Sequence, residues 1–296
     1  MPGSPLGMLS EAVTVVIATR NRRPGLCATL ERLTALPERP AVIVVDNGST
    51  DGTPATVRQA FPRAEVVALR RNLGASARNV GVRRVRTPYV ALSDDDSWWE
   101  PGSLDRAVRI LDAAPQVGLI TGTTLVGPEN DLDPINALLA ASPLDRAGLP
   151  GPRVLGFLGC AAVTRKDAYL AAGGYSRLLF IGGEEELLAY DLTAQRRPLV
   201  YCADIVVHHW PSAVRDARLR RSQELRNYVL VAWLRRPFAR AGSVTARLAR
   251  TATRDAVARR ALAGTALRLP TALLLRRRLP AWVEADIRLL EDGHAA

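Results

Sequence analysis

Residues 89–101 read YVALSDDDSWWEP, an apolar run that ends in three consecutive aspartates, Asp94, Asp95 and Asp96. Adjacent carboxylates at the end of a buried strand repel one another and lose hydration, so a purely structural role would be costly. A divalent cation such as Mg²⁺ or Mn²⁺ prefers oxygen ligands and would offset that repulsion. Ligands of open α/β sheets lie at strand ends of this kind. The triplet therefore favours a metal and ligand site over a solvated acidic turn.

The residues before this stretch alternate between strands and helices. The expected strands are Val13–Ala18, Ala41–Val45, Glu65–Leu69 and Tyr89–Leu92. Helices are expected at Pro24–Leu36, from Pro54 onward, and after a loop within Asn72–Val85. Apolar strands without polar alternation are typical of a parallel sheet that is covered on both faces. The fold class predicted for this half is therefore α/β.

In the second half of the chain, polar residues again follow directly after predicted strands. Phe157–Val163 is expected to form a strand, and Thr164–Asp167 to open a helix. A further strand at Asp204–Val207 ends in His208 and His209, two of the three histidines in the chain. Paired histidines after a strand favour a site over a chance surface pair, because a histidine there can bind a metal or a diphosphate.

Composition indicates a globular protein with one large or two modest domains. The chain has 296 residues, 48% of them hydrophobic, and its mean hydropathy is close to zero. No apolar run is long enough to span a bilayer, and the first ten residues lack the pattern of a signal peptide, so a cytoplasmic location is expected. Three widely spaced cysteines suggest neither a disulfide framework nor a zinc site.

The net charge of +11 is concentrated near the C-terminus. Residues 211–280 hold 17 arginines against three acidic residues, a surplus of +14, which leaves −3 for the rest. Helical patterns at Arg215–Leu234, Ala246–Leu262 and Leu273–Leu279 make this a basic helical extension. Such helices suit an anionic membrane surface, or they pack on the core with solvated arginines. Nucleic acid is disfavoured, because no zinc finger, RRM or helix-turn-helix signature is present.

Four motifs occur in order and with regular intervals: Val15–Asn21, Val44–Thr53, Asn72–Gly81 and Leu92–Asp96. Together they resemble the successive motifs of family 2 glycosyltransferases, and the resemblance covers roughly residues 12–210. It implies a GT-A type fold, in which a nucleotide-binding parallel-sheet half is fused to an acceptor-binding half. It also implies transfer of a sugar from a nucleotide-sugar donor to an acceptor hydroxyl, with inversion at the anomeric carbon.

The resemblance and the charge pattern together predict a division of the chain. Residues 1–11 are expected to form a flexible tail, and residues 12–211 the catalytic domain. Within that domain, residues 12–101 would bind the nucleotide-sugar and residues 102–211 the acceptor. Residues 212–296 would form the basic extension.

Donor contacts are expected at the ends of the first strands. Asp46 can accept a hydrogen bond from the base, and Ala18 and Thr19 offer backbone and hydroxyl contacts beside it. Asp51 is better explained as a turn and helix cap. Enzymes of this family use an arginine near the base or phosphates where Arg78 stands.

The family's DxD motif holds the metal that bridges the two phosphates, with Mn²⁺ or Mg²⁺ as the cofactor. Asp94 is assigned to the ribose side and Asp96 to the metal, while Asp95 could replace either in a shifted register. His209 and His208 are both candidates for a further metal ligand.

The catalytic base is expected in the acidic run Glu184-Glu185-Glu186. The family commonly has Glu-Asp there, and Glu185 stands where the usual catalytic aspartate is found. A glutamate can abstract the same proton with a longer arm. Glu185 is the first candidate for the base and Glu184 the second. One or two of the three glutamates can instead be explained as acidic residues that stabilise the first turn of a helix.

Other function classes fit less well. A dinucleotide-dependent oxidoreductase needs a G-x-G-x-x-G turn after the first strand, and residues 19–23 contain no glycine. A non-catalytic nucleotide- or nucleic-acid-binding protein that uses the basic segment remains the alternative. UDP is the default nucleotide, with dTDP and GDP as alternatives. The acceptor is a cell-surface glycan, a lipid-linked intermediate or a small natural product, and the oligomeric state stays open.

Overall fold

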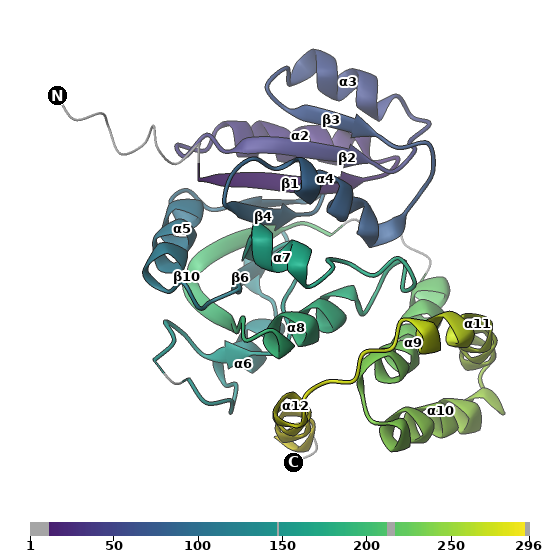
Figure 1. Ribbon diagram of the computed structural model, residues 1–296. Helices are drawn as coiled ribbons and strands as arrows, with labels where there is room; N and C mark the ends of the chain where they lie inside the picture. Colours follow the sequence, from purple (N-terminus) through teal and green to yellow (C-terminus); the bar gives the residue numbers. More distant parts are fainter. Residues whose placement is uncertain (1–11, 147, 212–216, 294–296) are drawn as a thin grey trace.

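A computed structural model describes residues 12–146, 148–211 and 217–293, so the expected tail at 1–11 lies outside the described residues (Figure 1). The strands are β1 Val13–Thr19, β2 Ala41–Asp46, β3 Glu65–Ala68, β4 Tyr89–Ser93, β5 Ser97–Trp99, β6 Leu119–Val126, β7 Asp131–Leu132, β8 Arg153–Val154, β9 Ala162–Arg165 and β10 Leu199–His209. The helices are α2 Arg23–Thr34, α3 Thr53–Ala60, α4 Arg78–Arg84 after the 3₁₀ turn Gly74–Ala77, α5 Ser103–Ala113, α6 Ile135–Ala140, α7 Lys166–Ala171, α8 Glu184–Ala194, α9 Ala217–Arg235, α10 Phe238–Ala252, α11 Ala256–Leu274 and α12 Ala281–Gly293.

The strands form one mixed sheet in the order β3-β2-β1-β4-β9-β6-β10-β5. The first four are parallel, as predicted, and β10 runs parallel to β6. Strand β9 is antiparallel to both β4 and β6, and β5 is antiparallel to β10. The parallel sheet predicted for the first half is therefore confirmed, and the second half adds antiparallel strands to it. The chain order reverses between β1 and β4, which is the position where open α/β sheets bind ligands.

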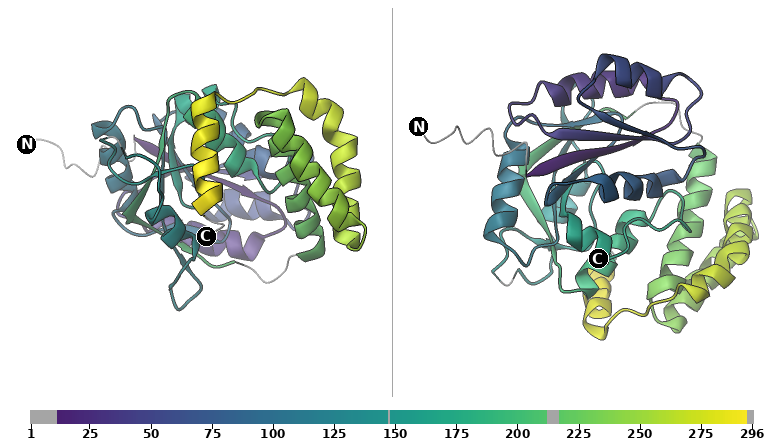
Figure 2. Two further views of the ribbon diagram at one scale, coloured as in Figure 1. Left: turned by 90° about the horizontal axis from the view of Figure 1, so that it is seen from below. Right: turned by 45° about the horizontal axis from the view of Figure 1, so that its top comes forward.

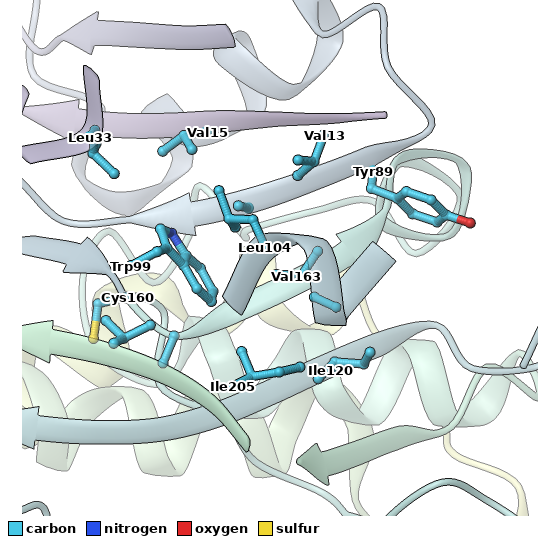
Figure 3. Packing of buried hydrophobic residues seen from close by; sticks show 14 of the residues in the cluster. Val13, Val15, Leu33, Tyr89, Trp99, Leu104, Ile120, Cys160, Val163 and Ile205 are labelled. Atoms are coloured by element: carbon cyan, nitrogen blue, oxygen red, sulfur yellow. The ribbon is translucent and has the colours of Figure 1, made fainter. Parts of the chain in front are cut away.

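Helices cover both faces of the sheet. Helices α2 and α5 bury leucines against Val13, Val15 and Ile17 on one face, where Trp99 and Leu104 complete the core (Figure 3). Helices α4, α7 and α8 cover the opposite face. Gly81 of α4 lies so close to the sheet that a Cβ atom there would come within 2.6 Å of Val16 Cγ1. This close approach explains why the motif has a glycine at that position.

Strand β10 contains a bulge. Its register with β6 shifts between Cys202 and Val206, so that residues 203–205 have no register partners on β6, although the Thr123 hydroxyl donates to the Ala203 carbonyl at 3.0 Å. The bulge crosses directly over Gly122, where a Cβ atom would lie 2.3 Å from the carbonyl oxygen of Ile205. Beyond the bulge, regular pairing with β6 and β5 resumes up to His209. The last residues of β10 are therefore held by partners on both sides.

The C-terminal helices pack on the rest of the molecule. Helices α9, α10 and α11 lie side by side, and α12 stands apart from them (Figure 2). A buried apolar cluster joins Leu179, Leu187 and Tyr190 to residues of α9 and α12. Arg235 of α9 donates to both carboxylate oxygens of Asp191 on α8, at 2.6 and 2.8 Å. Several arginines of the basic segment therefore stabilise this packing.

Three predicted elements need correction. The helix expected at Leu273–Leu279 does not form, because α11 ends at Leu274 and α12 begins only at Ala281. The strand expected at Phe157–Val163 begins only at Ala162, because residues 158–161 form a turn closed by the Ala161 N–H to the Leu158 carbonyl. An apolar run alone does not separate a strand from a buried turn. The helix expected at Ala246–Leu262 is broken, because Asp255 caps α11 by accepting from the Val257 N–H at 2.8 Å.

Within the described residues, we find no helix that is both long and apolar enough to cross a bilayer.

Candidate functional site

The site lies at the carboxyl ends of β1, β2, β4 and β10. Thr19 pairs with Asp46 across β1 and β2, and β4 lies on the other side of β1. The turn that follows β4 carries the aspartate triplet. Polar residues from distant parts of the sequence meet here because the ends of parallel strands share one edge of the sheet.

Asp95 points into the protein. Its carboxylate accepts a hydrogen bond from the Thr19 hydroxyl at 2.7 Å, and Arg22 Nε lies 3.6 Å from its other oxygen. Its backbone carbonyl accepts from the buried Thr29 hydroxyl at 3.0 Å. Burial raises the pKa of Asp95 to about 6, despite the hydrogen bond from Thr19. Asp95 thus connects β1 and α2 to the triplet. The Thr19 hydroxyl, which was expected to contact the base of the donor, donates to Asp95 instead.

Asp94, Asp96 and His209 form a cluster whose ligand atoms all lie within 4.8 Å of one another. His209 Nε2 is 3.4 Å from an oxygen of Asp96, and Arg22 Nη2 lies 2.8 Å from the other oxygen. Two carboxylates and one imidazole are suitable ligands for Mn²⁺ or Mg²⁺. We call these three residues the Asp-Asp-His cluster. Their side chains fit a divalent cation.

His208 lies outside the Asp-Asp-His cluster. Successive side chains of a strand point to opposite faces, so only one of the two histidines can reach it. The His208 ring contacts Glu100 Oε2 at 2.6 Å and Asn130 Oδ1 at 2.9 Å, and it stacks on Trp98. The neighbouring Trp99 is buried and donates to the Ser93 hydroxyl. These contacts hold the His208 ring beside Glu100 and Trp98, outside the cluster.

Arg78 connects the aspartate triplet to the second half of the molecule. Its buried guanidinium donates to the Ser93 carbonyl at 3.3 Å and pairs with Asp94. It also lies over the Tyr175 ring, 6.0 Å from the ring centre. Burial opposes its charge, but Asp94, Tyr175 and the carboxylates of Glu185 and Glu184 hold the pKa of Arg78 above its ordinary value. One cation thus interacts with acids from both halves of the site.

Asp46 and Asp51 differ in how their carboxylates are used. Asp46 is buried and accepts from the Ser49 N–H at 2.9 Å with one oxygen. Its other oxygen has no hydrogen-bond donor among the described residues. Asp51 accepts from the backbone N–H groups of Thr53 and Arg23, at 3.0 and 3.2 Å. Asp51 therefore caps helices, as predicted, whereas Asp46 retains an acceptor at the strand end beside the partly exposed Ala18.

The acidic run opens α8, and its three carboxylates point to different surroundings. Glu186 accepts from the Tyr190 hydroxyl at 2.6 Å, one turn along the same helix. Glu184 is buried, and one of its oxygens has no donor among the described residues. A Cβ atom at Gly159 would lie 2.8 Å from Glu185 Oε1 and 3.1 Å from the Tyr175 hydroxyl, so these two groups meet over this glycine. Burial, followed by repulsion from Glu184, raises the pKa of Glu185 to about 8.

The loop before α8 is held from two sides. Asn227 of α9 is buried and its Nδ2 lies 2.9, 2.8 and 2.5 Å from the carbonyls of Leu179, Ile181 and Gly182. On the other side, the Ala75 N–H donates to the Phe180 carbonyl at 2.7 Å. Phe180 has a positive φ of 69°, a conformation that costs free energy for a residue with a side chain. The loop is therefore kept in this shape by contacts from both the first half and the C-terminal helices.

Sequence reasoning missed three residues of this region. Arg22 lies three residues after the end of the first strand, so its position near a strand end could have pointed to Asp96. Tyr175 and Asn227 lie far along the chain from the residues they contact, and no local pattern marks them. Their roles depend on how the second half and α9 pack.

Comparisons with known proteins agree with this architecture. The model of the family described as Glycosyl transferase family 2 matches residues 14–170. The N-acetylglucosaminyl-diphospho-decaprenol L-rhamnosyltransferase of Mycobacterium tuberculosis is 26% identical over 250 residues, which cover 70% of this chain and 80% of the relative. The succinoglycan biosynthesis protein ExoO of Rhizobium meliloti is 36% identical over 107 residues, covering 34% of this chain and 30% of that protein.

Solved structures share the fold. The mannosyltransferase PcManGT from Pyrobaculum calidifontis, in complex with GDP-Man and Mn²⁺, aligns with a TM-score of 0.57 and 22% identity, over 95% of this chain and 87% of that one. S. aureus TarS 1–349 in complex with UDP-GlcNAc aligns with a TM-score of 0.57 and 15% identity, over 74% and 66% of the two chains.

Proposed function

This chain belongs to glycosyl transferase family 2, and from that premise we propose that it transfers a sugar, with inversion, from a nucleotide-sugar donor to an acceptor hydroxyl. The observation that carries the proposal is the position of Arg78, which pairs with Asp94 and also interacts with Glu184 and Glu185. Arg78 would lie between the diphosphate of the donor and the base on the acceptor side. A cation in that position can stabilise the negative charge that develops during transfer of the sugar. In this proposal residues 12–101 bind the donor, residues 102–211 face the acceptor, and residues 212–296 form the C-terminal extension.

The donor would lie along the ends of β1, β2 and β4. The unpaired oxygen of Asp46 accepts from the base, beside Ala18 and Thr19. Asp94 contacts the ribose side and Arg78 donates to the diphosphate, for which a guanidinium is well shaped. Asp95 stabilises the turn. The support for this arrangement is that all of these groups follow neighbouring strands of one sheet.

The Asp-Asp-His cluster would hold the metal, with Asp96 and His209 as ligands and Asp94 within reach. When bound, Mn²⁺ or Mg²⁺ would offset the negative charge of the departing nucleoside diphosphate. Arg22 lies 2.8 Å from Asp96 and would orient that carboxylate.

Glu185 would act as the base, with Glu184 as the second candidate. The acceptor oxygen forms a bond to the anomeric carbon while the bond from that carbon to the phosphate oxygen breaks, and the acceptor proton passes to the carboxylate. Attack from the side opposite the leaving group inverts the configuration. Burial and Glu184 raise the pKa of Glu185 to about 8, so its carboxylate is a stronger base than an exposed glutamate.

The acceptor is proposed to be a lipid-linked glycan intermediate. The mycobacterial relative is named for a diphospho-decaprenol acceptor, and it aligns over 70% of this chain. An enzyme with such an acceptor works at a membrane surface, and the basic C-terminal helices suit an anionic one at the cytoplasmic face. The nucleotide is proposed to be UDP. dTDP and GDP are the competing candidates, because the bases of all three nucleotides offer an N–H group to Asp46.

The alternative, a non-catalytic binding protein that uses the basic segment, is not favoured. Several of its arginines are engaged within the protein, such as Arg235 with Asp191 and Arg236 with Glu284 and Glu291. These groups are unavailable to a nucleic-acid backbone.

A thermal-shift panel tests the proposed function. UDP, dTDP and GDP are compared with and without Mn²⁺, because a ligand that binds only the folded state raises its melting temperature. One nucleoside diphosphate should raise it, and more so with Mn²⁺. Asp96→Ala should lose the increment that depends on Mn²⁺. If none of the three shifts the wild type in the presence of Mn²⁺, the proposed donor site is wrong.

A further inference from the structure

A cleft of about 590 Å³ lies where the first 211 residues meet the C-terminal helices, and we call it the junction cleft. Its walls come from α4, the turn after α7, α8, the end of α9 and the segment 274–277, which contains the last residue of α11 and the residues that follow it. That segment is fixed along α9, because the Arg277 N–H donates to the Leu234 carbonyl at 3.0 Å (Figure 1). A volume of this size is ordinary for a small-molecule site.

The lining of the junction cleft is strongly basic. Five arginines contribute to it: Arg83, Arg177, Arg235, Arg276 and Arg277. The acidic group in the lining is Asp191, which already receives both hydrogen bonds of Arg235 and lies 3.8 Å from Arg277. The cleft therefore has an excess of positive charge.

Much of this charge is unmatched. Arg83 and Arg177 are exposed and form no ion pair within the described part of the chain. The Arg276 guanidinium donates to the backbone carbonyls of Trp233 and Arg236, which carry no full charge. Burial, and then repulsion from Arg278 and Arg235, lower the pKa of Arg276. An anion in the cleft would relieve this repulsion.

Apolar side chains accompany the arginines. Leu187 and Leu234 line the inside of the cleft, while Leu274 and Leu275 lie at its mouth with 86% and 52% of their surface exposed. Leu267, on the same helix as Leu274, is 80% exposed. Exposed leucines next to arginines are typical of surfaces that lie against a bilayer, where the apolar groups enter the acyl region and the cations meet phosphates.

We propose that the junction cleft binds the phosphate headgroup of a lipid, with Leu274 and Leu275 directed into the bilayer. Arginine suits this ligand because its planar donors match pairs of phosphate oxygens. The inference rests on the proposed action at a membrane. It is independent of the transfer chemistry, because the junction cleft includes none of Asp94, Asp96, His209 or Glu185.

The test is co-sedimentation of the full chain with phosphatidylcholine vesicles, with and without phosphatidic acid, in EDTA and without donor. Arg83→Ala/Arg177→Ala removes two charges from the cleft. Arg58→Ala/Arg63→Ala is the matched control, because these exposed arginines lie on α3 and just after it, at the opposite end of the molecule (Figure 1). The cleft pair should weaken binding to phosphatidic acid vesicles roughly tenfold or more, and the control pair by less than about threefold. Equal losses in both pairs, or no loss in the cleft pair, would overturn the proposal.

A second variant separates a lipid phosphate from a free one. Leu274→Gln alters a side chain that is almost fully exposed, so the fold should be kept. It should weaken vesicle binding while the thermal shift produced by inorganic phosphate stays unchanged. If Leu274→Gln binds vesicles like the wild type and inorganic phosphate releases the protein from them, the cleft holds a soluble phosphate and the lipid assignment is wrong. The donor-dependent thermal shift, measured on the same variants, reports separately on the proposed transfer.

Discussion

Asn227→Ala tests whether the C-terminal helices hold the loop that leads into the acidic helix. Asn227 is fully buried, and its Nδ2 is the donor to the carbonyls of Leu179, Ile181 and Gly182. Alanine removes that donor and leaves the carbonyls facing a small cavity. The variant also removes the acceptor of Arg226 Nε, and it leaves every proposed ligand of the donor untouched.

The expected loss of stability follows from the hydrogen bonds. The Leu179 carbonyl keeps a donor in Arg226 Nη2 at 2.8 Å, so the two carbonyls that lose a donor are the partly buried ones of Ile181 and Gly182. An unsatisfied buried group costs about 1–3 kcal/mol, and because water reaches part of these two we expect a total loss of roughly 1–3 kcal/mol in the free energy of unfolding. Asn227→Asp keeps the shape and the hydrogen bond from Arg226 Nε, but it turns an acceptor toward the carbonyls of Ile181 and Gly182, so it should also be destabilising.

Equilibrium unfolding in urea measures this loss. Gln223→Ala is the control, since Gln223 is on the same helix and partly exposed, and it should cost no more than about 0.5 kcal/mol. Turnover, measured well below the unfolding transition, should fall about tenfold or more in Asn227→Ala with little change in donor affinity, because the loop positions Glu185. An Asn227→Asp protein as stable as the wild type would refute the reasoning, as would an Asn227→Ala protein with normal turnover.

Three further predictions concern the site itself. Asp96→Ala should abolish metal-dependent binding of the nucleoside diphosphate and its transfer; wild-type turnover with Mn²⁺ would move the assignment to Asp95. Glu185→Gln should leave donor affinity nearly intact in titrations while turnover falls by roughly 10² or more, and full activity would shift the base to Glu184. Burial and Glu184 raise the pKa of Glu185 from 4.5 to about 8, so its contribution to stability is present below its unfolded-state pKa and is lost as the pH rises through 8. Urea titrations across that range should show wild type losing stability relative to Glu185→Gln, and parallel curves would contradict the burial of this carboxyl.

The first half of the fold was predictable because its signals are local. Strands β1, β2 and β4 are short apolar runs that end in polar turns, and their ends meet by the geometry of parallel strands. Strands β5 and β9 were not predictable in orientation, because their pairing depends on β10, β6 and β4, far away in the sequence.

The site was predictable by region but not by side-chain direction. The triplet and the histidine pair were expected near one sheet edge, yet a sequence cannot say which of adjacent residues on a strand or turn faces inward. Asp95 turns toward Thr19, and His208 toward Glu100, because of pairings formed only in the folded chain. Asn227 could not be predicted either, because its contacts with the carbonyls of residues 179–182 form only in the folded chain.

The bulge in β10 makes the position of His209 independent of the length of the chain just before it. Residues 203–205 have no register partners on β6, whereas His209 is paired with Val126 on one side and Ser97 on the other. Insertions or deletions at the exposed Ala203 and Asp204 can therefore be absorbed within the bulge, without turning the histidine away from the aspartates. Related chains should vary in length at this point while keeping a histidine at the end of the strand.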